Sequence, residues 1–161
     1  MAVLITPNGD VILRGDLIEL TDTIGNTDIK AAAGIAASKC QRGPVIFVRQ
    51  TGEAVTETII ALFCKGLTGT VKNFTVSNLT ANGGAATVTV DLRKNGVTML
   101  SAVVTLDSTK AAFSANKGTL SVVALADGDY LTVVITAIPN GTDALASGVF
   151  AQIQWDEDYL V

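Results

Sequence analysis

The chain alternates between apolar and polar residues from about residue 56 onward, which is the pattern of strands with one buried face. Residues 86–93 show this alternation over their whole length. The apolar positions are Val88, Val90 and Leu92, and the polar positions are Thr87, Thr89, Asp91 and Arg93. The spacing predicts a strand that turns its apolar set toward a core and its polar set toward solvent.

Further segments repeat this alternation and end at turn-forming residues. We expect strands at residues 71–76, 97–106, 120–125, 130–138 and 148–155. Gly, Asn or Asp stands at nearly every reversal, where these residues suit tight turns. No helix-length segment separates the strands, so the pattern predicts an all-β fold, an antiparallel β-sandwich or jelly roll.

The first residues indicate a small hairpin. Val3, Ile5, Val11 and Leu13 alternate with polar residues on both sides of Pro7-Asn8-Gly9-Asp10. Asn-Gly is a strong hairpin signal, because both residues tolerate a positive φ.

An alanine-rich segment follows and predicts a short helix at residues 27–39, capped by Thr27 or Asp28. Gly43-Pro44 ends this segment. Residues 45–48 are then expected to form a short buried strand.

These patterns divide the chain into two regions. We expect residues 1–56 to form an N-terminal arm with a hairpin and a short helix. We expect residues 57–161 to form the sandwich. The arm buries little core by itself, so we expect it to reach a neighbouring subunit or a larger assembly.

The composition indicates a surface that other subunits cover. Of the 161 residues, 48% are hydrophobic and 16% are charged. A typical soluble domain has roughly 25% charged residues. The mean hydropathy of +0.46 is high for a soluble monomer, and we infer that part of the apolar surface is buried in an assembly.

The charge excludes two classes of partner. The net charge is −4, and the 11 Lys and Arg residues form no run. Nucleic acids and polybasic membrane attachment need clustered positive charge, so neither is expected. We recognise no signal peptide and no apolar stretch of membrane-spanning length, and expect folding in a cytoplasm. Cys40 and Cys64 are then expected to be buried thiols, with a disulfide formed after lysis as the alternative.

The residue types needed for most catalytic sites are missing. The chain has no histidine, which removes Ser-His-Asp and Cys-His arrangements and His-containing zinc sites. Gly66-Leu67-Thr68-Gly69 lacks the Lys-Ser/Thr of a phosphate-binding loop. We therefore expect a protein that is not an enzyme, without catalytic, metal-binding or cofactor-binding residues.

Three features have more than one interpretation. Asp127-Gly128-Asp129 is interpreted as a turn, with a calcium site or a catalytic carboxylate pair as alternatives. Asp156-Glu157-Asp158 is interpreted as a solvated tail after the last strand, or as a segment that docks on a basic partner. Trp155 is expected in the core or a subunit contact rather than in a sugar-stacking platform, since only 5% of residues are aromatic.

Two segments resemble a known class of virion proteins. The first is residues 87–101, with Val90-Asp91-Leu92-Arg93-Lys94-Asn95-Gly96 at its centre, and the second is Leu125-Ala126-Asp127-Gly128-Asp129-Tyr130-Leu131-Thr132-Val133. They resemble the jelly-roll domains of tailed-phage virion proteins, found in capsid decoration (cement) proteins and in fibre or spike appendages. The resemblance covers about residues 57–155. It implies a jelly-roll sandwich, a homotrimer, and a location in the virion after assembly in the host cytoplasm.

Three functions are consistent with these observations. The first is a decoration protein that binds the major capsid protein of the assembled shell and stabilises it. The short chain favours it, because a fibre usually carries a long repetitive shaft and none is recognisable here. The second is the receptor-binding head of a fibre or spike that recognises host polysaccharide, which predicts aromatic residues clustered at one end of the sandwich. The third is a small bacterial carbohydrate-binding module, which the missing export signal disfavours.

Overall fold

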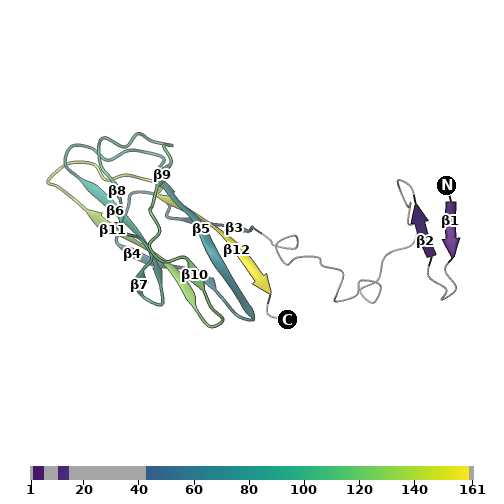
Figure 1. Cartoon of the computed structure of the whole chain (residues 1–161). Coiled ribbons are helices and arrows are strands. Elements are labelled where there is room, and N and C mark those ends of the chain that lie inside the picture. Colours follow the sequence, from purple (N-terminus) through teal and green to yellow (C-terminus); the bar gives the residue numbers. More distant parts are fainter. Residues whose placement is uncertain (1, 6–10, 15–42, 160–161) are drawn as a thin grey trace. The chain divides into compact units, whose positions relative to one another are not determined.

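The computed structural model describes residues 2–5, 11–14 and 43–159. The chain divides into two compact units, Met1–Ala36 and Ala37–Val161. The strands are labelled in Figure 1. The described residues include no helix long and apolar enough to cross a membrane.

The first unit contains two described strands, β1 (Ala2–Ile5) and β2 (Val11–Arg14). They pair antiparallel, with Val3 opposite Leu13 and Ile5 opposite Val11. The predicted pairing is therefore confirmed. The turn between the strands, the helix predicted at residues 27–39 and Cys40 lie outside the described residues.

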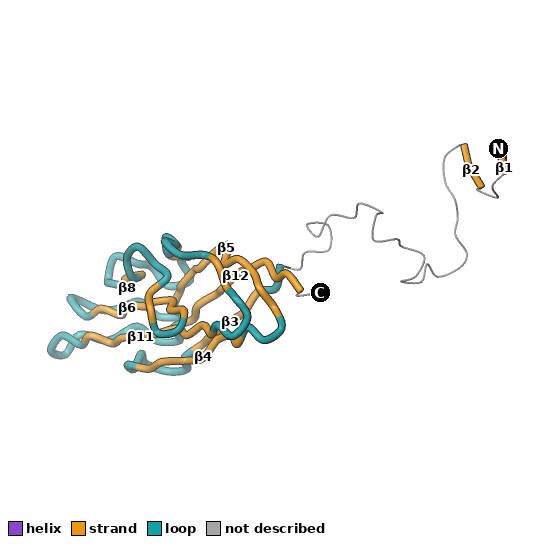
Figure 2. The backbone as a smooth tube through the Cα atoms, turned by 60° about the horizontal axis from the view of Figure 1, so that its bottom comes forward, coloured by secondary structure: helices purple, strands orange, loops and turns teal. Residues whose placement is uncertain are grey.

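The second unit is a β-sandwich of two antiparallel sheets. The β5–β12 sheet contains β3 (Val45–Arg49), β5 (Leu67–Ser77), β9 (Asn116–Lys117), β10 (Ala124–Leu125) and β12 (Phe150–Tyr159). The β6–β11 sheet contains β4 (Glu57–Phe63), β6 (Thr87–Lys94), β7 (Val97–Thr98), β8 (Val104–Leu106) and β11 (Tyr130–Ile138). The tube in Figure 2 shows these two layers. The predicted all-β antiparallel sandwich is confirmed.

The core lies between the sheets and consists largely of the alternate apolar residues that the sequence pattern predicts to face inward. The predicted inward set of β6, namely Val88, Val90 and Leu92, is fully buried. The same holds for the central strands β11 and β12. Their buried apolar residues are Leu131, Val133 and Ile135 in β11, and Ala151, Ile153 and Trp155 in β12, and Thr132 on the outer face of β11 is buried as well. Each large side chain buried in this way contributes about 1.5–3 kcal/mol to folding.

The strand predicted at residues 97–106 is wrong in its middle. Two short strands, β7 and β8, pair with the two ends of β6. Between them the chain turns inward, because Met99 is fully buried and Leu100 forms a bridge with Leu120. The strand predicted at residues 120–125 shrinks to β10 for the same reason. The residues that precede β10 form hydrogen bonds to the inward turn at Met99 instead. The Ser121 N–H donates to the Met99 carbonyl at 2.7 Å.

The strand predicted at residues 45–48 exists as β3, but it is not buried as predicted. It lies at the edge of its sheet, so Val48 faces the core while Phe47 is 67% exposed. β3 pairs with β12, so the sandwich begins before residue 57. The expected boundary at residue 56 is therefore wrong, because residues 45–49 already supply a strand of the sheet.

A close approach of backbone and ring fixes the pairing of β5 with β12. Gly69 of β5 lies against Trp155 of β12, and a Cβ added at Gly69 would lie 2.7 Å from two carbons of the indole ring. The Asp156 carbonyl oxygen would be closer still. Only glycine therefore fits at this position.

We predict that Gly69→Ala destabilises the sandwich by about 1–3 kcal/mol, because the added methyl group forces either the indole or the β12 backbone to move. Guanidinium unfolding measures this change. Gly43→Ala is the matched control, since its Cβ would meet only Asp156 Oδ1 at an ordinary 3.5 Å. Equal stability of the two variants would contradict the close packing.

Candidate interaction surfaces

The Asp127-Gly128-Asp129 segment forms a turn that ties three chain reversals together. Gly128 has φ +90°, as a tight turn requires. Asp127 Oδ1 accepts the Gly66 N–H at 2.7 Å. Asp129 accepts the Ala126 N–H at 2.8 Å and the Asn95 side-chain amide at 2.6 Å. The turn interpretation is confirmed, and both carboxylates are used in holding neighbouring loops.

Three surface carboxylates are held in their charged form by similar bonds. The Ala126 N–H, and then the Asn95 amide, lower the pKa of Asp129. The Asn140 amide and the Ala85 N–H lower the pKa of Asp143, and bonds from Thr109 lower the pKa of Asp107. Each of these carboxylates closes a loop at an end of the sandwich.

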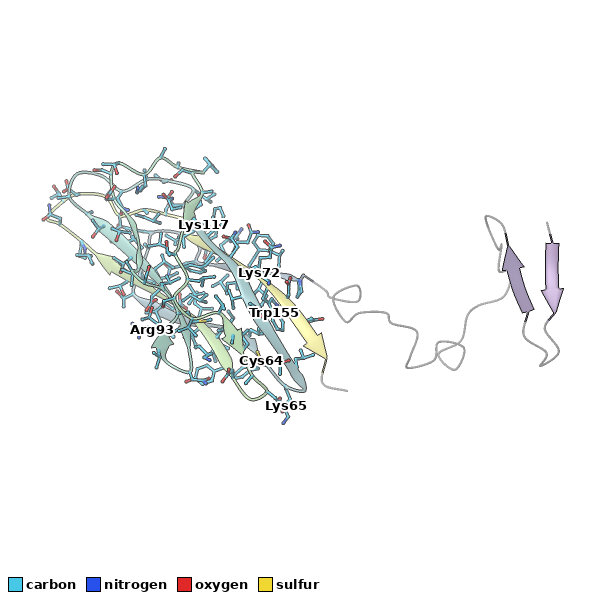
Figure 3. The ribbon with its side chains drawn as sticks, in the orientation of Figure 1. Cys64, Lys65, Lys72, Arg93, Lys117 and Trp155 are labelled. Carbon is cyan, nitrogen blue, oxygen red and sulfur yellow. The ribbon has the colours of Figure 1, made fainter. Side chains whose placement is uncertain are left out.

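No group of three or more His, Cys, Asp or Glu side chains converges to hold a metal ion within the described part of the chain. The basic side chains there are also spread out. Figure 3 shows Lys65, Lys72, Arg93 and Lys117 at separate places on the sandwich.

Cys64 lies beneath the turn and is 1% exposed. Its N–H donates to the Asp129 carbonyl at 2.8 Å, and its carbonyl accepts the Gly128 N–H at 2.7 Å. Burial raises the pKa of the Cys64 thiol, and the neighbouring Asp129 and Asp127 carboxylates raise it further. The predicted burial is confirmed for Cys64.

The acidic segment after Trp155 is part of a strand. Asp156 lies opposite Thr70 of β5, and the pairing of β12 with β5 continues to Tyr159. Asp156 forms an ion pair with Lys72 at 3.2 Å. The predicted solvated tail is therefore wrong, because the long strand β5 offers backbone partners to these residues. Trp155 itself is 2% exposed, which confirms its predicted place in the core.

Within residues 43–159, the exposed aromatic residues do not all gather at one end of the sandwich, and Phe47, which is 67% exposed, lies midway along β3. The Phe63 and Tyr130 rings lie 6.1 Å apart near the start of β5. Phe113 is 73% exposed, and its N–H donates to the carbonyl of Asn78, just after the end of β5. At ~3.3 Å per strand residue, β5 separates these positions by roughly 35 Å.

A polar group that the sequence pattern did not single out lies on the outer face of β6. Asp91 was predicted to face solvent, but it is only 4% exposed. Its carboxylate accepts the Arg93 Nε–H at 2.8 Å and the Thr98 hydroxyl at 2.6 Å. The three residues line a shallow cavity of about 520 Å³ together with residues 100–103. The Asp-x-Arg spacing on one strand face was the available signal.

An apolar surface lies where the edge strands β3 and β4 meet, and we call it the open side. It carries four exposed large side chains, Val45 (41%), Phe47 (67%), Ile60 (58%) and Phe63 (62%). β3 and β4 contact each other there and lie together in Figure 2. An exposed surface of this composition is typical of contacts between proteins.

No protein-family model and no curated protein matches the chain. The carboxylates of Asp127 and Asp129 are engaged within the sandwich, whereas the large apolar side chains of the open side are exposed.

Acid unfolding tests the loop carboxylates. Because the pKa values of Asp107, Asp129 and Asp143 are lower in the folded state than the ordinary 3.8, their stabilisation is complete above that value. It is lost as the pH falls through the lowered values. We expect Tm to fall over this acidic range, and to fall less steeply in Asp129→Asn. Equal slopes would contradict the assigned role.

Thiol labelling tests the burial of Cys64. In a Cys40→Ser variant, we expect Cys64 of the folded protein to resist a thiol-specific reagent at neutral pH, since the thiol is covered and its pKa is raised. The same variant should label fully in denaturant. Rapid labelling of the folded protein would show that the turn opens readily.

Proposed function

We propose that this chain is a structural protein of a tailed-phage virion, a capsid decoration protein of jelly-roll type. In this proposal it acts as a homotrimer, binds the major capsid protein of the assembled shell and has no enzymatic activity. The resemblance of residues 87–101 and 125–133 to such domains supports it. So does a surface with few charges and several exposed aliphatic side chains.

The observation that carries the proposal is the division of the chain into two unequal units. The sandwich has its own core, whereas the described part of the first unit is a two-stranded sheet. A two-stranded sheet alone is marginally stable in water. An arm of this kind gains stability when it lies on another protein, which is the arrangement expected of a subunit that attaches to a shell.

Stabilisation of the shell would follow from mass action. A protein that binds the assembled shell, and not its separated subunits, shifts the equilibrium toward assembly by an amount that grows with its concentration and affinity. Many copies add their contributions. The bound sandwich needs only a stable fold and a contact surface for this role.

The receptor-binding head of a fibre or spike is the alternative. It requires a cluster of aromatic and polar residues at one end of the sandwich. Phe63 and Tyr130 lie at one end and Phe113 at the other, which favours the decoration role.

A binding experiment tests the proposal. Purified protein is added to tailed-phage particles assembled without it, and bound copies and the temperature of shell disruption are measured. We expect saturable binding of many copies spread over the shell, and disruption at a higher temperature. Few copies at one vertex would support the receptor-binding head. A monomer that does not bind particles would contradict both functions.

A further inference from the structure

The four edges of the sandwich are protected unequally. On one side, both sheets end in short strands: β9 and β10 have two residues each, β7 has two and β8 has three. Loops connect these short strands, and Lys117 is the second residue of β9. Short strands and lysines prevent a sheet edge from pairing with another chain.

The open side lacks this protection. β3 has five residues and β4 has seven, and each is the last strand of its sheet. Within residues 43–159, no strand or loop forms backbone hydrogen bonds to the free edge of either one. One irregularity occurs, a register shift near Ala61, and Glu57 to Ile60 remain regularly paired before it.

The side chains of these edges also favour pairing. The charged residues in the two strands are Arg49 and Glu57, and neither strand contains Pro or Lys. Phe47 of β3 is 67% exposed, and Ile60 and Phe63 of β4 are 58% and 62% exposed. A long uncharged edge of this composition is an aggregation hazard unless a partner strand covers it.

We propose that the open side binds a second copy of this chain, with β3 of one copy adding to β4 of the next. An open edge presents backbone donors and acceptors at strand spacing, so its natural occupant is another strand. Among the four edges of the sandwich, β3 and β4 are the only long ones. A second copy therefore supplies a matching edge for each of them.

The directions of the strands agree with this pairing. β4 reverses into β5, β5 is antiparallel to β12, and β12 is antiparallel to β3. β3 and β4 therefore run in opposite directions, and copies related by an axis along the strands would join them antiparallel. With Phe47 beside Ile60, this register places Arg49 of β3 beside the uncharged Thr58 of β4 on the outer face. Glu57 lies on the other face, opposite Ile135, and accepts the Gln50 side-chain amide of its own chain at 2.9 Å, so no like charges meet in the pairing.

The faces of the strands agree as well. Phe47 and Ile60 are 67% and 58% exposed, and they alternate with the core-facing residues Val48 and Ile59, so both point away from the core. Joining β3 to β4 makes the outer faces continuous and allows Phe47 to pack beside Ile60. In a threefold ring every copy would use both long edges, which leaves none open. The pairing deepens the homotrimer of the proposed function, but it does not depend on shell binding.

Disulfide trapping tests the pairing. In a Cys40→Ser background, Phe47→Cys and Ile60→Cys are combined in one chain and the purified protein is mildly oxidised. We expect covalent dimers and trimers on a non-reducing gel. Phe47→Cys with Val97→Cys is the matched control, because Val97 is 69% exposed but lies on β7 at the opposite side. The control should remain largely monomeric on the gel.

Three results would overturn the pairing. The first is a monomeric mass of the unmodified protein by light scattering. The second is equal cross-linking of the Phe47→Cys, Val97→Cys control. The third is cross-linking of a variant that carries Ile60→Cys alone, which would indicate that β4 pairs with β4. As a second measurement, Ile60→Lys should lower the mass in solution while Val97→Lys should not, with Tm confirming that both variants fold. Particle binding is scored separately. Cross-linking without particle binding would reject the decoration function and leave the pairing intact.

Discussion

The packing of alternate apolar side chains between the two sheets is the interaction on which the rest of the molecule depends. Phe74 of β5, Leu92 of β6, Leu131 of β11 and Ile153 of β12 are buried in one core. Their burial fixes the register of each strand, because a slip by one residue would exchange the buried face for the polar face. The positions of turns, edges and surface groups all follow from that register.

The ends of the sandwich are held by polar contacts rather than by additional core. Asp127 and Asp129 connect reversals that belong to different sheets, and Asn82 does the same at the other end. Asn82 donates to the Leu106 carbonyl and accepts the Ala146 N–H, and it is 4% exposed. A small number of well-placed amides and carboxylates therefore keeps the loops of residues 43–159 in place.

Strand positions could be predicted from the sequence wherever one strand has a core on one side and solvent on the other. This condition holds for β6, β11 and the first part of β12. It fails at residues 97–106, where the chain turns inward at Met99 and forms two short strands. Their apolar residues are spaced as they would be in one long strand, so the break cannot be recognised from the pattern. It also fails at Asp91, since periodicity places a residue on a face but does not show that Arg93 and Thr98 cover it. Edge positions such as Phe47 could not be recognised, because a central and an edge strand share the same apolar residues.

The order of strands along the chain has a consequence for biosynthesis. β12 contains the last described residues, yet it lies between β5 and β3 at the centre of its sheet. While the ribosome has not yet made it, β3 lacks its only partner in the sandwich and β5 has only the short strands β9 and β10 beside it. The nascent chain must therefore carry incomplete apolar strands until translation passes residue 150, and the sheet closes in a late step.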